Sequence, residues 1–161
     1  FTHTQGWAVI AETMLGHGDL AWQYFRATMP GAWNTRAEVR EIEPYVYCQF
    51  THSKYSPRFG ASRVPWLSGS ATWSFYTATQ YILGLRPEYD GLRIDPCIPS
   101  AWKSFKVTRN FRGKKVKVEV RNPGAVQKGV RKLVLNGEPL EGNLIPVGKL
   151  ASENQVIVEM G

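Results

Sequence analysis

Apolar residues recur at helical spacing in two stretches near the start of the chain. Between residues 4 and 15 they fall at i, i+3, i+4, i+7 and i+8, beginning at Trp7 and ending at Leu15. A second stretch of the same kind extends to Thr28, and Asp19 is expected to cap it. The two stretches predict a pair of antiparallel helices joined by a short link.

A third helix is predicted over residues 69–83, where apolar and aromatic side chains occur on nearly every side. Such a helix is expected to be buried on more than one face. Ser68 is the expected N-cap, because its hydroxyl can accept a hydrogen bond from a free amide of the first turn. Residues 30–63 contain prolines and aromatics without a long period, so they predict a long loop of the kind that is often functional.

After Gly84 the hydrophobic period changes from helical to two. Alternation from Phe105 to Val120, interrupted at Arg112-Gly113, predicts a β-hairpin with one solvated, basic face. Further strands are expected at Leu133–Leu135 and Gln155–Met160, with an Asn-Gly hairpin turn directly after the first of them.

These elements together predict an α+β fold in two parts. Residues 1–84 are helical, and residues 85–161 are expected to form an antiparallel β-sandwich or part of one. Three helices with a large aromatic loop do not readily enclose a core, so the helical part is interpreted as one arc of a larger helical barrel.

Composition and charge narrow the function classes. The 161 residues are 43% hydrophobic and 20% charged, which is typical of a globular protein. The net charge of +7 lies in the second part, since residues 91–161 hold thirteen Lys/Arg against six Asp/Glu, while residues 1–90 hold seven of each. This distribution argues against a nucleic-acid role for the whole protein, although the basic hairpin alone could contact an acidic partner.

Few of the standard catalytic patterns occur. Cys48 and Cys97 have no metal-ligand spacing, there is no P-loop or G-x-S-x-G, and no histidine has an evident triad partner. No membrane span or signal peptide is visible, so a cytoplasmic location without membrane contact is expected. The chain starts at Phe1 without a methionine, and we expect it to be an internal piece of a longer protein.

One feature suits a negatively charged ligand. Ser68 offers a hydroxyl, and Gly69 leaves the first turn of the third predicted helix bare, so that its free amides can be approached. An ordinary capped core helix is the simpler interpretation of this stretch when it is taken alone.

Three stretches resemble the C-terminal part of glycoside hydrolase family 94, and the similarity continues into the β region. They are His3–Ala8 (HTQGWA), Glu43–Gln49 (EPYVYCQ) and Trp66–Trp73 (WLSGSATW), followed by Tyr89–Pro99 (YDGLRIDPCIP) and Asn143–Pro146 (NLIP). The resemblance implies that residues 1–84 are the last arc of an (α/α)6 catalytic barrel and that residues 85–161 are a C-terminal β domain.

The activity that the resemblance implies is inverting phosphorolysis of a β-linked disaccharide. The most specific expectation is cellobiose plus phosphate giving α-D-glucose 1-phosphate and D-glucose, with cellodextrin, chitobiose or laminaribiose as alternatives. No cofactor is expected, because inorganic phosphate is a substrate and replaces the water of an inverting hydrolase. A carbohydrate-binding β module is an alternative of a different class. The β region contains only one tryptophan, Trp102, for stacking on a sugar, which counts against this alternative.

The resemblance also implies roles for individual residues. His3, Ser68 and Gly69 would contact the phosphate, and Gln49 would hydrogen-bond the glucosyl unit that is transferred. Many relatives carry threonine in place of Ser68, and the hydroxyl is kept. The general-acid aspartate and the phosphate-binding arginines are expected before the start of this chain. No catalytic residue is therefore assigned, and the chain alone is predicted to be inactive. The remainder of the parent chain and a second subunit in a homodimer are the expected partners.

Overall fold

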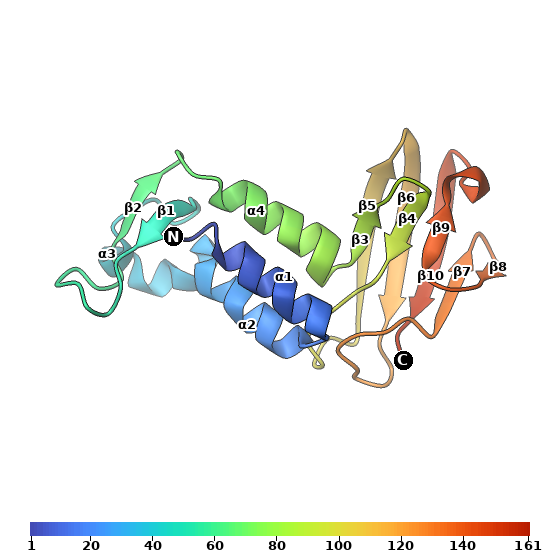
Figure 1. The fold of residues 1–161 in the computed structure, drawn as a ribbon, viewed down its shortest axis with the longest axis horizontal. Helices are drawn as coiled ribbons and strands as arrows, with labels where there is room; N and C mark the ends of the chain where they lie inside the picture. Colours follow the sequence, from blue (N-terminus) through green and yellow to red (C-terminus); the bar gives the residue numbers. More distant parts are fainter.

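The computed structural model describes residues 1–161. The molecule is elongated, with helices along its middle, a small hairpin at one end and a β region at the other (Figure 1). No helix of the chain combines the length and the apolar character needed to cross a bilayer.

Helices α1 (Gln5–Leu15) and α2 (Gly18–Thr28) form the predicted antiparallel pair. Gly16 ends α1 in the left-handed conformation, with φ of 85°, and its amide donates to carbonyls of the last turn. The expectation that Asp19 caps α2 is wrong. The cap position is His17, two residues earlier, and the Asp19 carboxylate instead accepts hydrogen bonds from Ser100 of the β region at 2.9–3.2 Å.

The third helix, α4 (Ser70–Thr77), continues as a short π-helix, η2 (Ala78–Ile82). Gly69 occupies the cap position, one residue after the predicted Ser68, although the Ser68 hydroxyl does accept the Ser70 amide at 3.0 Å. The helix is buried on one side only, since Phe75 is 70% exposed. The predicted burial on several faces is therefore not found within this chain, because no layer covers that side.

The expected long loop contains short elements that the sequence pattern did not indicate. A 3-10 helix, η1 (Pro30–Arg36), leads into α3 (Ala37–Arg40), and strands β1 (Cys48–Thr51) and β2 (Ser62–Pro65) pair as an antiparallel hairpin. Val64 and Trp66 have positive φ angles, so the backbone turns sharply on both sides of Pro65 before α4 begins.

The β region contains two sheets. A five-stranded sheet has the order β5-β6-β10-β7-β8, and a three-stranded sheet has the order β3-β4-β9. The bounds are β3 Leu85–Pro87, β4 Gly91–Ile94, β5 Ser104–Phe111, β6 Lys114–Arg121, β7 Lys132–Leu135, β8 Glu138–Leu140, β9 Leu144–Pro146 and β10 Glu153–Glu159, with a 3-10 helix, η3 Val147–Lys149, before β10. Both sheets contribute to one hydrophobic core.

Two predicted hairpin turns are confirmed, at Arg112-Gly113 and Asn136-Gly137, where all four residues have positive φ. The prediction of an entirely antiparallel sheet is wrong, because β10 pairs with β6 in parallel. This pairing joins strands that are far apart in the sequence, so no hairpin constrains its direction.

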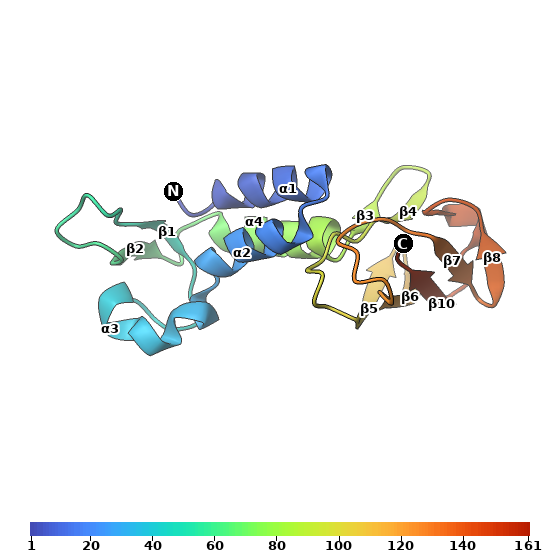
Figure 2. The same ribbon diagram turned by 90° about the horizontal axis from the view of Figure 1, so that it is seen from below.

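The core continues from the β region into the helices. It includes Val9 of α1, Ala21 of α2 and Ile82 of η2 together with the inward side chains of the sheets. Lys128 reinforces this junction, since its ammonium donates to the carbonyl of Thr13 in the last turn of α1 at 2.7 Å. The β region therefore packs against the ends of the helices, as the second view also shows (Figure 2).

Candidate functional site

The N-termini of two helices lie at the same end of the molecule. Helices α1 and α4 run side by side in the same direction, and both begin near the β1–β2 hairpin (Figure 1). The rings of Trp7 and Trp73 meet edge to face at 5.8 Å between the two helices. A Cβ on Gly6 would lie 3.2 Å from the Thr77 hydroxyl, so the glycine permits this close approach. The positive ends of two helix dipoles are thus placed together.

Hydrogen bonds around strand β1 bring the predicted site residues to this end. The Thr2 amide, next to His3, donates to the Gln49 carbonyl at 2.8 Å. The Ser68 hydroxyl donates to the Cys48 carbonyl at 3.3 Å. The structure therefore gathers three segments that are distant in sequence, which contain His3, Gln49, Ser68 and Gly69, around one short strand.

The start of α4 is open to a ligand. Gly69 is exposed, and the nearest atom to a Cβ built on it would be a ring carbon of Trp73 at 3.6 Å. The amides of Gly69, Ala71 and Thr72 have no acceptor within the chain. Free amides at a helix N-terminus that begins with a glycine suit a tetrahedral oxyanion.

His3 lies at the start of α1, and both of its ring nitrogens are available. The imidazole meets the Phe1 ring edge to face at 5.6 Å and lies 6.5 Å from the Trp7 ring. These are ring–ring contacts and use no hydrogen bond of the imidazole, so a ring nitrogen can still donate to a ligand.

Two carboxylates near this end are already engaged. Glu43 accepts a hydrogen bond from the Trp66 indole at 3.1 Å, which lowers the pKa of its carboxyl group. Glu41 pairs with Arg63 at 2.7 Å. A carboxylate that is held by a fixed donor is poorly placed to pass a proton to a substrate, so neither residue suits the role of a general acid. No group of His, Cys, Asp and Glu side chains in the chain could hold a metal ion.

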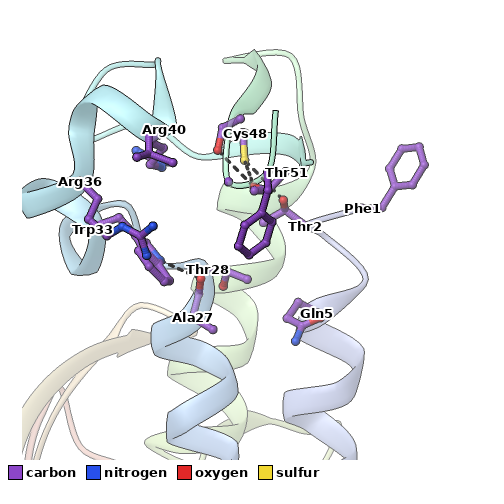
Figure 3. A pocket seen from close by; sticks show the side chains of 14 residues that line it. Phe1, Thr2, Gln5, Ala27, Thr28, Trp33, Arg36, Arg40, Cys48 and Thr51 are labelled. Atoms are coloured by element: carbon purple, nitrogen blue, oxygen red, sulfur yellow. Dashed lines mark hydrogen bonds between the residues drawn. The ribbon is translucent and has the colours of Figure 1, made fainter. Parts of the chain in front are cut away.

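A cavity of about 350 Å³ lies beside the same strand (Figure 3). None of the four predicted residues lines it. The Cys48 thiol and the Thr51 hydroxyl lie on one side of it, and Trp33 and Arg36 lie on another. Arg40, also in the lining, is buried and donates to the carbonyls of Glu43 and Val46.

The environment of Cys48 changes its acidity. Burial raises the pKa of the thiol, but hydrogen bonds from Thr2, Thr51 and Ser62 and the charge of Arg40 outweigh this effect, so the pKa is lowered overall. Cys48 thus faces the cavity with its sulfur and the start of α4 with its carbonyl. No role was predicted from the sequence for the Cys48 carbonyl or for Ser70, whose hydroxyl also donates to this carbonyl at 2.8 Å.

Comparison with known proteins gives two matches to protein families. Residues 1–84 match the model described as the catalytic domain of the glycosyl hydrolase 94 superfamily. Residues 85–141 match the C-terminal domain of glycosyl hydrolase family 65.

Individual relatives resemble the chain over nearly its whole length. N,N'-diacetylchitobiose phosphorylases from Vibrio proteolyticus and Vibrio furnissii are each 42% identical over 100% of the chain, which corresponds to 20% of each relative. Solabiose phosphorylase from Paenibacillus borealis is 29% identical over 91% of the chain and 19% of its own length. The chain thus spans about a fifth of these relatives. Since the first family model covers more than half of the chain, this protein belongs to the glycosyl hydrolase 94 superfamily.

Proposed function

We propose that the full-length protein containing this chain is an inverting phosphorylase of β-linked disaccharides. The observation that carries the proposal is the open start of α4, where Ser68 and Gly69 lie beside the parallel start of α1. The relatives support it, because those named above are all disaccharide phosphorylases.

In this proposal inorganic phosphate binds at the start of α4. The Ser68 hydroxyl and the Gly69 amide donate hydrogen bonds to its oxygens, and His3 supplies a further donor. Charge-assisted bonds of this kind also hold the nucleophile at a fixed position relative to the sugar. Gln49 hydrogen-bonds the glycosyl unit that is transferred.

The proposed reaction is a single displacement at the anomeric carbon. A phosphate oxygen forms a bond to that carbon from the face opposite the leaving group, and the glycosidic C–O bond breaks. The electron pair goes to the leaving oxygen, which takes a proton from a general acid elsewhere in the full-length protein. The product is an α-glycosyl 1-phosphate, and no cofactor is needed.

The relatives bear on which disaccharide is cleaved. Identity to the two N,N'-diacetylchitobiose phosphorylases is 42%, against 29% for the solabiose enzyme, so N,N'-diacetylchitobiose is the first substrate to test. Cellobiose, which the sequence motifs favour, is the second.

Residues 1–84 are proposed to supply the last arc of the catalytic barrel, and residues 85–161 a C-terminal β domain. Parallel α1 and α4 with exposed Trp7 and Phe75 support the arc, since these side chains lack a covering layer in the chain. A homodimer in the cytoplasm is proposed on the family resemblance alone.

The experiment is an assay of the full-length protein with each disaccharide, followed by phosphorus and proton NMR. We expect phosphate-dependent cleavage that yields an α-1-phosphate. Hydrolysis that proceeds without phosphate would contradict the proposal. The 161-residue chain alone is expected to release no sugar phosphate, and measurable release would show that it contains a sufficient acid.

A further inference from the structure

Ser70, the first residue of α4, contacts the Ser68 hydroxyl with both its backbone amide and its side chain. Its side chain is almost completely buried, with only 1% of the residue exposed. Its backbone amide donates to the Ser68 oxygen at 3.0 Å, and the two hydroxyl oxygens lie 2.7 Å apart. Two polar groups of one buried residue thus fix the oxygen that the proposed function places against phosphate.

The other end of this arrangement is the Cys48 carbonyl. The Ser70 hydroxyl donates to it at 2.8 Å. Cys48 lies opposite Pro65 in the β1–β2 pair, and proline has no amide hydrogen to offer a facing carbonyl. The serine hydroxyls supply donors in its place, so the strand and the helix start are joined through them.

The two hydroxyls carry one proton each, which limits the possible arrangements. The shorter contact to the Cys48 carbonyl belongs to Ser70, at 2.8 Å, whereas Ser68 lies at 3.3 Å. Without a ligand the Ser70 proton goes to the carbonyl, and the Ser68 proton points to the Ser70 oxygen or to the same carbonyl. An oxyanion is a stronger acceptor than a hydroxyl or a carbonyl, so the Ser68 proton can turn toward it. The Ser70 proton can then turn to the Ser68 oxygen, since either hydroxyl can be the donor across the 2.7 Å contact, and together with the Ser70 amide it keeps that oxygen in place.

We propose that Ser70 is a positioning residue for phosphate, acting through Ser68 without contacting the substrate. The inference rests on the proposed function, since it concerns the same phosphate. It predicts that Ser70 affects the use of phosphate and leaves the binding of the disaccharide unchanged.

The test measures the KM of the full-length enzyme for phosphate and for the disaccharide in the Ser70→Ala variant. We expect the KM for phosphate to rise roughly fivefold to tenfold, as for the loss of one hydrogen bond, and the KM for the disaccharide to stay the same. Ser74→Ala is the matched control, because it makes the same change one turn later in α4 and should match the wild type. An equal rise of both KM values would assign Ser70 a structural role only.

A double variant separates the two serines. If Ser70 acts through Ser68, Ser68→Ala combined with Ser70→Ala has the same KM for phosphate as Ser68→Ala alone. If the two substitutions instead multiply their effects on the KM for phosphate, Ser70 does not act through Ser68. A wild-type KM for phosphate in Ser68→Ala contradicts the proposed function itself. If the KM for phosphate rises in Ser68→Ala but stays at the wild-type value in Ser70→Ala, Ser70 has no positioning role and the proposed function still stands.

Ser70→Cys covers the case in which the alanine variant fails to fold. It keeps a side chain of similar size with a weaker donor. Its KM for phosphate should lie between those of the wild type and Ser68→Ala, and a wild-type value would contradict the inference.

Discussion

At the scale of single residues, the two cysteines show how surroundings set acidity. Both are buried, and both are free thiols. Burial raises the pKa of Cys97 to about 11, with Lys128 lowering it and Asp95 raising it further. Cys48, by contrast, has a lowered pKa and lines a cavity, because its hydroxyl neighbours and Arg40 outweigh the effect of burial.

The first prediction concerns the reactivity of these thiols. The thiolate is the reactive form, so the group with the lower pKa reacts faster at a given pH. Iodoacetamide at pH 8 should alkylate Cys48 well before Cys97 in the folded 161-residue chain, as measured by peptide mass spectrometry over time. Equal rates in denaturant serve as the control, and faster modification of Cys97 in the folded chain would contradict the assignment.

A second prediction follows from the raised pKa of Cys97. Between the ordinary thiol pKa of 9.0 and about 11, the unfolded chain has lost this proton while the folded chain keeps it. The contribution of Cys97 to stability is therefore complete below pH 9 and falls as the pH rises toward 11. Urea unfolding from pH 8 to 11 should show a steeper loss of stability for the wild type than for Cys97→Ala, and identical slopes would refute this.

The sequence predicted part of the candidate site at this scale. A helix start at Ser68 and Gly69 was recognisable because it is encoded by adjacent residues, whereas the phosphate-binding role came from the family resemblance. The role of Ser70 could not be predicted from local pattern, since it depends on the carbonyl of Cys48, 22 residues away. The lowered pKa of Cys48 likewise depends on Thr2 and Arg40, which only the fold brings near it.

At the scale of elements, locally determined structures were predicted and others were not. The apolar period of α1 and α2 is contained within each helix, and the positive-φ turns of the β-hairpins are encoded by two residues each. Strands β1 and β2 have four residues apiece, too few to show a period, and no Asn-Gly turn follows either of them as it follows the equally short β7. The parallel pairing of β6 with β10 depends on the tertiary fold, and the alternation of apolar and polar residues does not indicate the direction in which a strand pairs.

A third prediction tests how α2 meets the β region. Gly18 begins α2, and a Cβ on it would lie only 2.1 Å from the carbonyl oxygen of Ile98, a backbone atom that cannot move aside alone. Gly18→Ala should lower the free energy of unfolding by about 3 kcal/mol. Urea denaturation measures this, with Gly31→Ala as control, because a Cβ on Gly31 meets nothing within 4 Å. Equal stability of the two variants would contradict the packing described.

At the scale of the whole molecule, the helices and the β region share one core and a set of polar contacts. Lys128 is central to these contacts, since it donates to the Thr13 carbonyl at 2.7 Å and lies 3.4 Å from the Asp95 carboxylate. A cation at the C-terminal end of α1 also interacts favourably with the helix dipole.

A fourth prediction follows for Lys128→Met. Loss of the ammonium should destabilise the chain by about 1–2 kcal/mol in thermal or urea unfolding, because the Thr13 carbonyl loses its charged donor and Asp95 loses a cation. Lys132→Met removes the same charge from an exposed position without an ion pair and should change stability by less than about 0.5 kcal/mol. A Lys128 variant as stable as that control would show that the junction relies on the apolar core alone.

The overall arrangement places the start of α4 at the end of the helices that is far from the β region. The β region packs against one end of the helices, and at the other end the amides of Gly69, Ala71 and Thr72 at the start of α4 have no acceptor (Figure 1). Uncovered helix starts lose little stability when a ligand rather than a side chain satisfies their amides.

The kinetics of Ser68→Ala in the full-length protein show whether phosphate binds at the start of α4. The variant removes one donor from the proposed phosphate site and leaves the helix and the Gly69 amide in place. We expect the KM for phosphate to rise by roughly tenfold, while the KM for the disaccharide stays at its wild-type value. An unchanged dependence on phosphate would contradict the claim that the start of α4 binds it.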